Sequence, residues 1–216
     1  QIVAALQSGE YDLNNTSVFI SQTGGGCRAS NYIGFIRKAL TDANITTVPV
    51  VSLNAIGLEN NPGLELNMTF AKIALMATVF GDLLMRVTQH MRPYEVNAGE
   101  TNALYEHYKI KAFKVLESGS LRQYRKLIKE IVTAFDHIII NQVKKPRVGI
   151  VGEILVKYHP SGNNQLAWVL ENEGAEVSVP DLMDFFLYTA YTSKFKYEKL
   201  NASWKSWRNN RIAIEI

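Results

Sequence analysis

The stretch Val18-Phe-Ile-Ser-Gln-Thr-Gly-Gly-Gly-Cys27 decides how the first part of this chain is expected to fold. Its apolar start is typical of a short buried strand, and the glycines that follow end that strand. Apolar positions between Ile33 and Leu40 then predict a helix, and the apolar run 48–53 predicts a second strand. A strand, a helix and a second strand in this order indicate a parallel βαβ unit with a right-handed crossover.

The middle of the chain is predicted to be helical. Apolar residues step by three and four through Met68–Met91, which predicts a long helix that is buried on more than one side. Arg92-Pro93 ends it, because the residue before proline avoids helical geometry. Two further helices are predicted at 101–117 and 121–136, separated by a Ser-Gly-Ser turn.

A second parallel βαβ unit is predicted after the junction Lys144-Lys-Pro146, with strands at 148–151 and 177–179 around a helix at 164–173. A helix rich in Phe and Tyr then begins at Asp181. The predicted fold is α/β, with two parallel βαβ (Rossmann- or flavodoxin-like) units and a helical insertion between them. The predicted domains are a first α/β unit at 1–66, the insertion at 67–143, and the start of a second α/β unit with a C-terminal helix at 144–216.

Composition limits the classes of function. Hydrophobic residues make up 47% and charged residues 20% of the 216 residues, which is typical of a soluble globular protein. The 23 Lys and Arg against 20 Asp and Glu give no strong attraction to nucleic acid or to a membrane surface. The single cysteine excludes an internal disulfide and suits the reducing cytoplasm. An iron–sulfur or zinc site needs about four ligands, which one cysteine does not supply.

The ends of the sequence and its most apolar segment also carry information. The chain begins with Gln1 in a helical pattern and finishes in an apolar run at Ile216, so we expect an internal piece of a longer polypeptide. No basic region followed by a long apolar stretch indicates a signal peptide. Lys72 and Asp82 interrupt the apolar segment 68–85, so we expect no membrane span there.

The glycine-rich turn is the first candidate site. Gly24, Gly25 and Gly26 allow the backbone to turn sharply and to approach a bulky ligand closely. Cys27 would then lie near a helix N-terminus, where backbone N–H groups favour a thiolate, and Arg28 adds positive charge. Such a turn also suits a phosphate, although neither the P-loop nor the dinucleotide spacing is present. The alternative is a small buried cysteine in a tight turn.

The segment 151–164 is the second candidate site. Its polar residues Glu153, His159 and Asn163 follow a predicted strand and precede a predicted helix, so they could face a substrate or cofactor. The alternative is a solvated loop that caps the following helix. The four histidines show no spacing that indicates a metal site. Lysines and arginines interleaved with tryptophans near the C-terminus could bind nucleic acid, but more often form the solvated and packing faces of one helix.

Five segments, in this order, resemble the large acyl-CoA dehydratase activase-related proteins of anaerobic bacteria. They are Ser21–Arg37, Val79-Phe-Gly-Asp82, Met91-Arg-Pro-Tyr-Glu95, Lys144–Lys157 and Val179–Tyr188. The resemblance covers nearly the whole chain. In that family a pair of ATPase modules, similar to the activator of 2-hydroxyglutaryl-CoA dehydratase, precedes a region similar to the dehydratase subunits. The present chain resembles the second region.

The resemblance implies a cofactor, partners and a substrate class. Dehydratase subunits hold a [4Fe–4S] cluster with three cysteines and receive a low-potential electron from an ATP-driven activator. Cys27 corresponds to the middle cysteine of the family pattern, whose other two cysteines lie before and after the present sequence. The implied partners are the rest of the same polypeptide, including its ATPase modules, and the implied substrate is an acyl-CoA. We expect no nucleic acid or membrane partner, and little cluster binding or activity from a chain with one ligand.

Two other classes of function remain open at this point. The chain could be a non-catalytic scaffold that docks the ATPase module through the helical insertion. It could also be a module that binds CoA or another phosphate-bearing molecule through the glycine-rich turn.

Overall fold

The computed structural model describes residues 1–22, 27–54, 67–205 and 207–208. The chain divides into two compact units, Gln1–Glu65 and Leu66–Ile216. Each unit contains a pair of parallel strands and several helices, so the predicted α/β class is confirmed as a mixed α/β structure.

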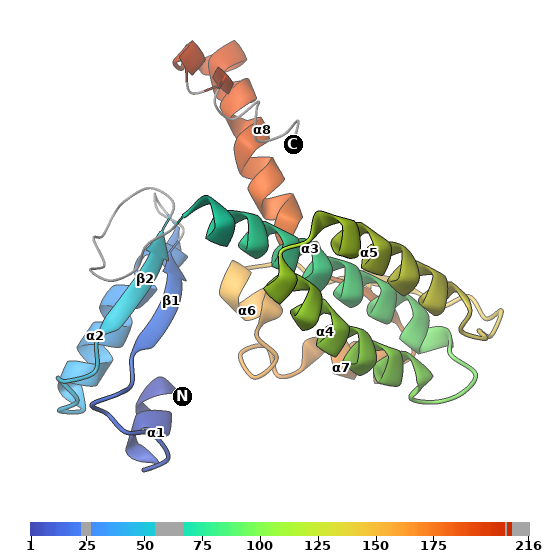
Figure 1. The fold of residues 1–216 in the computed structure, drawn as a ribbon, viewed down its shortest axis with the longest axis horizontal. Helices are drawn as coiled ribbons and strands as arrows, with labels where there is room; N and C mark the ends of the chain where they lie inside the picture. The colour runs from blue at the N-terminus through green and yellow to red at the C-terminus, as the bar shows by residue number, and fades with distance from the viewer. Residues whose placement is uncertain (23–26, 55–66, 206, 209–216) are drawn as a thin grey trace. The chain divides into compact units, whose positions relative to one another are not determined.

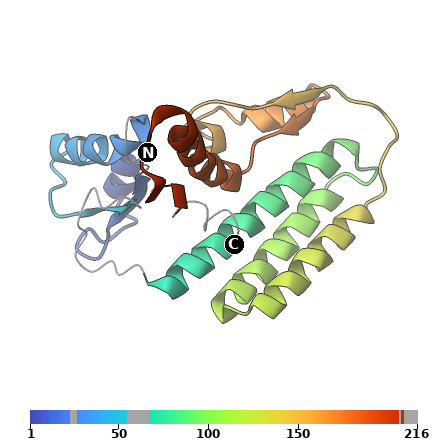
Figure 2. The same cartoon turned by 90° about the horizontal axis from the view of Figure 1, so that it is seen from above.

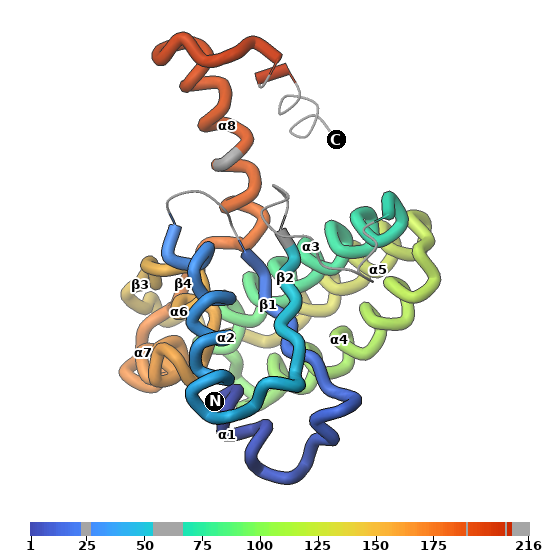
Figure 3. Tube along the Cα trace, turned by 90° about the vertical axis from the view of Figure 1, so that its left-hand side faces the viewer, coloured from blue at the N-terminus to red at the C-terminus, as the bar shows by residue number. Residues whose placement is uncertain are grey.

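The first unit contains the parallel βαβ arrangement that the sequence predicts (Figures 1 and 3). The two strands pair in parallel, with Val18 opposite Val50 and Gln22 opposite Asn54. In Figure 3 they run side by side, next to the helix that connects them. The elements are α1 (Ile2–Gln7), β1 (Val18–Gln22), η1 (Arg28–Ser30), α2 (Tyr32–Asp42) and β2 (Val50–Asn54).

The core of the first unit lies between α2 and the strands. Ile33 and Leu40 stand two turns apart on α2, and both are buried in a cluster that includes Val50 of β2. On β1 the side chains alternate between partly buried and exposed. Phe19 is 56% exposed, so the sheet face that carries it stays open within this unit.

Three long helices build the first part of the second unit. They are α3 (Met68–Met91), α4 (Glu100–Ser118) and α5 (Leu121–Asp136), and the one-turn helix η2 (Arg92–Tyr94) follows α3. Figure 2 shows the three long helices side by side. Phe80 of α3, Tyr108 of α4 and Ile131 of α5 meet in one buried cluster. The three predicted helices are therefore confirmed, with their ends within one or two residues of the prediction.

One segment in the described part of the chain, Met68–Tyr94, is long and apolar enough to cross a membrane by length and composition. Its residues Phe80 and Leu84 are buried against α4 and α5. A core helix of a soluble protein passes the same test, so this segment is weak evidence for a membrane span.

The second βαβ arrangement completes this unit. Its strands pair in parallel, with Arg147 opposite Glu176, and Val177 is buried in a small core between them and the helices. The elements are β3 (Arg147–Gly149), α6 (Ile154–Tyr158), α7 (Leu166–Asn172), β4 (Glu176–Ser178) and α8 (Leu182–Leu200). The short helix α6 was not predicted, because five residues are too few for a periodic pattern.

The sheets are smaller than the predicted fold requires. Among the described residues each sheet has two strands, and the pairs β1–β2 and β3–β4 belong to separate sheets. A Rossmann- or flavodoxin-like fold has a larger, continuous open sheet. The structure thus shows two parallel βαβ arrangements, and the finer fold assignment stays a prediction.

Candidate functional site

Cys27 lies in the first unit, between β1 and α2. Gln22, the last residue of β1, donates from Nε2 to the carbonyl oxygen of Ser30 over 2.8 Å. The hydroxyl of Ser52 on β2 lies 3.3 Å from Oε1 of the same Gln22. One glutamine side chain therefore ties the end of the turn to both strands and keeps Cys27 near the carboxyl end of the sheet, where parallel α/β structures bind ligands.

The backbone around Cys27 explains how its thiol is presented. Cys27 is extended, with φ −92° and ψ 145°, and its carbonyl accepts a hydrogen bond from the N–H of Ser30 over 3.1 Å. It stands at the N-cap position of η1, which leads into α2. Its side chain is partly exposed, and Arg28 is exposed next to it. Gly24, Gly25 and Gly26 lie outside the described residues.

The donor set around Cys27 fits one ligand of a cluster and not a complete site. Cys27 is the single cysteine of the 216 residues. In the described part of the chain, no three His, Cys, Asp or Glu side chains gather as a metal would require. A cluster held here would need further thiolates, which this sequence does not contain.

The second candidate site lies in the other unit, where its polar side chains bind the backbone. A carboxylate oxygen of Glu153 accepts from the N–H of Val156 over 2.9 Å, which caps α6. Nδ1 of His159 lies 3.0 Å from the N–H of Gly162. Asn163 donates from Nδ2 to the carbonyl of Val156 over 3.0 Å, and a second such bond reaches the next carbonyl. These side chains stabilise the loop between α6 and α7.

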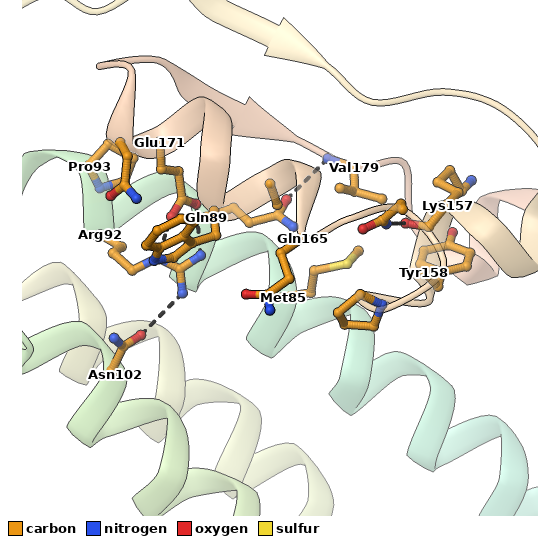
Figure 4. A pocket seen from close by; sticks show the side chains of 15 residues that line it. Met85, Gln89, Arg92, Pro93, Asn102, Lys157, Tyr158, Gln165, Glu171 and Val179 are labelled. Carbon is orange, nitrogen blue, oxygen red and sulfur yellow. Dashed lines mark hydrogen bonds and ion pairs between the residues drawn. The ribbon is translucent and has the colours of Figure 1, made fainter. Parts of the chain in front are cut away.

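A cavity of about 490 Å³ lies beside this loop. Its walls come from α3 and η2, from Asn102 of α4, from the end of α6 and the loop that follows it, from α7, and from Val179 after β4. Figure 4 shows Arg92 and Glu171 towards one end, Lys157 and Tyr158 towards the other. Asn163 belongs to the lining of this cavity, whereas Glu153 and His159 do not.

Three contacts hold the cavity walls together. Arg92 binds Glu171 of α7 through two hydrogen bonds, each 2.7 Å long. Gln89 of α3 accepts from the N–H of Val179 over 3.1 Å. Tyr158 donates its hydroxyl to the carbonyl of Pro180 over 2.5 Å. Paired Arg–carboxylate bonds fix both partners in one geometry, so α7 is held in place against η2.

The hydroxyl of Tyr158 stays protonated over the whole physiological range. Burial, together with the negative charges of Asp82 and Asp181, raises the pKa of Tyr158 to about 12. A protonated phenol is the donor that the bond to Pro180 requires. Tyr158 therefore holds the α6 end of the cavity against the segment before α8.

Other polar residues of α3 bind the segment that leads into α8. Both carboxylate oxygens of Asp82 accept backbone N–H groups, from Leu182 and from Met183, over 2.8 Å. Arg86 forms an ion pair with Asp181. Burial raises the pKa of Asp181, although the adjacent Arg86 favours the charged form. We call these contacts of Asp82, Arg86 and Gln89 with residues 179–183 the α3 seam.

Glu176 on β4 extends these contacts to the second sheet. Tyr94 donates its hydroxyl to Glu176 over 2.8 Å, and Nδ1 of His90 lies 3.0 Å from the same carboxylate. Nε of Arg147 lies 3.1 Å away on the paired strand. Burial alone would raise the pKa of Glu176, but these hydrogen bonds and the charge of Arg147 lower it. The buried carboxylate is therefore ionised at neutral pH.

The α3 seam was missed at the sequence level, and of the cavity only the lining from segment 151–164 was anticipated. A signal for the seam exists, because Asp82, Arg86 and Gln89 recur at intervals of four and three residues on a helix whose other residues are mostly apolar. Lys157, Tyr158 and Asn163, which line the cavity, lie in the polar segment 151–164 that the sequence marks as a candidate site. Trp168 carries no comparable signal, since single tryptophans are common on surfaces.

Comparisons with family models, with curated proteins and with solved structures give no match for this chain. The resemblance to the dehydratase-related proteins therefore stays an expectation from the five sequence segments.

Proposed function

We propose that Cys27 is a thiolate ligand of a [4Fe–4S] cluster in a protein related to the 2-hydroxyacyl-CoA dehydratase subunits, and that ATP-coupled electron transfer reduces this cluster. The single observation that supports this most is the position of Cys27. It is partly exposed and near the carboxyl end of a parallel strand pair, directly before η1 and α2. Thiolates at such positions are accessible to a large inorganic group.

The residues of this chain would bind and orient the group. Cys27 would supply one sulfur, and Arg28 would offset part of the negative charge of a thiolate-bound cluster. The Gln22 side chain would keep the turn in place, because it is anchored to Ser30. A bound cluster would supply one-electron transfer at low potential. The remaining thiolates, the ATPase modules and an acyl-CoA substrate belong to the protein beyond these residues, in a cytoplasmic, reducing environment.

Alkylation of the thiol tests this proposal in the intact protein. Anaerobic reconstitution with iron and sulfide should protect Cys27 from iodoacetamide, and removal of iron with a chelator should restore its reaction. Mass spectrometry of the peptide that contains Cys27 measures both states. Equal alkylation with and without iron would exclude Cys27 as a ligand.

A second candidate function, docking of the ATPase module, is favoured by the exposed face of α5. This face carries four exposed cations, Arg122, Arg125, Lys126 and Lys129. Of these, Lys126 lies close enough to Glu130 to help lower the pKa of that carboxyl. Such a surface suits an acidic partner.

The variant Arg125→Glu/Lys129→Glu tests the docking surface in the intact protein. It should weaken association with the separately expressed ATPase module and leave the iron content unchanged. Lys114→Glu, an exposed change on α4, serves as the control. Unchanged affinity in the double variant would reject this surface.

A further inference from the structure

The helix α8 is held at its start and exposed over its last turns. Its first N–H groups bind Asp82 of α3, and Ala190 in its middle is buried. From Lys194 to Leu200 every residue is exposed. Helices in proteins gain most of their stability from packing, so we expect a helix with this much exposed surface to bind a partner.

One side of α8 carries exposed aromatic side chains. Tyr188, Tyr191 and Phe195 follow one another at steps of three and four residues, so they lie on the same side of the helix. They are 71%, 55% and 56% exposed. This spacing is typical of helices that pair lengthwise with another helix. We call these three residues the α8 stripe.

The two ends of the α8 stripe carry opposite charges. Asp184 lies four residues before Tyr188, and Lys199 lies four residues after Phe195. Both charged side chains are exposed, and their spacing keeps them on the side of the stripe. An antiparallel second copy of α8 would therefore place Tyr188 opposite Phe195 of the other copy. The same alignment places Asp184 opposite Lys199.

The other charges around the start of α8 keep this end acidic. Three carboxylates contribute to the raised pKa of the adjacent Tyr158, those of Asp82, Asp181 and Asp184. Arg86 is paired with Asp181, and Lys157 lies over the Tyr158 ring. Arg147, which lines the same hollow as Asp184, is paired with Glu176. Four carboxylates thus face three cations, and the net charge is negative.

The far end of α8 is basic. Between Lys194 and Leu200, three lysines stand against the carboxylate of Glu198, and one of its oxygens lies 3.8 Å from Nζ of Lys194. Lys199 is thus left as a cation at the end of the α8 stripe. An acidic start and a basic end attract each other when two copies pair antiparallel and repel each other when they pair parallel.

We infer that two copies of this chain bind each other through the α8 stripe, as an antiparallel helix pair with Asp184 of each copy opposite Lys199 of the other. Such a pair has twofold symmetry, and its axis passes near Tyr191, so the two Tyr191 rings meet at the centre. Three aromatic side chains per copy make a small interface, so the dimer is weak and reversible. The inference goes beyond the proposed cluster function and does not depend on it, because α8 and Cys27 belong to different units.

Sedimentation equilibrium of the intact protein tests this pairing, at concentrations up to about 0.1 mM. The wild type should form reversible dimers. Tyr191→Ala should weaken dimerisation at least about tenfold, because both copies lose the central contact. Lys114→Asp, an exposed change on α4, should leave dimerisation unchanged.

Charge reversal distinguishes this pairing from a dimer formed by another surface. Asp184→Lys and Lys199→Asp should each weaken dimerisation about tenfold, because each change places like charges at both ends of the pair. The double variant Asp184→Lys/Lys199→Asp should regain the affinity of the wild type, since the exchanged charges attract each other again. Circular dichroism should show the same helical signal for all variants, because the altered side chains are exposed.

Three results would overturn the inference. The first is a wild type that stays monomeric over the whole concentration range, which would leave the α8 stripe to a different protein. The second is a dimer that Tyr191→Ala does not weaken. The third is a double charge variant that dimerises no better than the single variants.

Discussion

Asp82 caps a helix that begins about one hundred residues later in the sequence. Its carboxylate accepts the first N–H groups of α8, from Leu182 and Met183. Asp181 occupies the N-cap position of α8, but it caps no N–H and pairs with Arg86 instead. The carboxylate of Asp82 thus satisfies the first N–H groups of α8 in place of the N-cap residue, and it ties α8 to α3.

We predict that Asp82→Ala loosens α8 and lowers the stability of the protein. The change leaves two N–H groups without their acceptor, which should reduce the free energy of unfolding by about 1–3 kcal/mol. Chemical denaturation measures this loss, and amide hydrogen exchange should be faster at the start of α8. Asp136→Ala, at an exposed position of α5, is the control and should stay close to the wild type.

Glu176 should make stability depend on pH. Its pKa is lower in the folded state than its usual value of 4.5, so its contribution is present above about pH 4.5 and is lost as the pH falls through the lowered value. The difference in unfolding free energy between the wild type and Glu176→Gln should therefore shrink below pH 4.5. Denaturation curves at several pH values measure it, with the exposed Glu117→Gln as the control. If the difference in unfolding free energy between the wild type and Glu176→Gln stayed constant down to pH 2, the lowered pKa of Glu176 in the folded state would be contradicted.

At the scale of elements, the bounds of α3, α4 and α5 could be predicted closely, because the apolar spacing and the turn residues in this part of the sequence indicate the same helices. Apolar residues recur at helical spacing, and Gly119 and Ser120 separate α4 from α5. In the structure Gly119 adopts φ 59°, and the hydroxyl of Ser120 accepts from the N–H of Gln123. These are the stop and start signals of consecutive helices.

Burial on α5 gives a sharp prediction for this layer. Ile131 is 0% exposed, whereas its neighbour Val132 is 39% exposed. Ile131→Ala should lower the free energy of unfolding by about 2–5 kcal/mol, because it removes a buried side chain and leaves a cavity. Val132→Ala should change it by about 0.5 kcal/mol or less. Similar losses in both variants, measured by urea denaturation, would contradict the packing described for α5.

The second βαβ arrangement shows where prediction from sequence stops. Apolar runs in the sequence predict its strands and α7. They do not reveal whether the polar side chains between β3 and α7 bind a ligand or the backbone. Glu153, His159 and Asn163 are residue types that serve both as ligand groups and as caps, and the structure uses them for the loop backbone. The α3 seam joins residues about ninety or more positions apart, so no local pattern could pair them.

At the scale of the whole molecule, the two candidate sites belong to separate units. The sequence placed Cys27 after a strand and before a helix because that turn is local, and the structure adds the Gln22–Ser30 bond that anchors it. The cavity in the second unit depends on packing between α3 and α7, which sequence spacing does not reveal. Each site can therefore be altered without the other.

The central claim is that Cys27 binds an iron–sulfur cluster, and iron analysis after anaerobic reconstitution tests it most directly. The intact protein would be compared with Cys27→Ser and with Ser21→Ala, an exposed change on β1 that leaves the thiol in place. We predict that iron and sulfide per protein fall sharply in Cys27→Ser, with loss of the cluster absorption, and that Ser21→Ala equals the wild type. Equal iron and sulfide in Cys27→Ser and the wild type would contradict the claim and assign Cys27 a structural role.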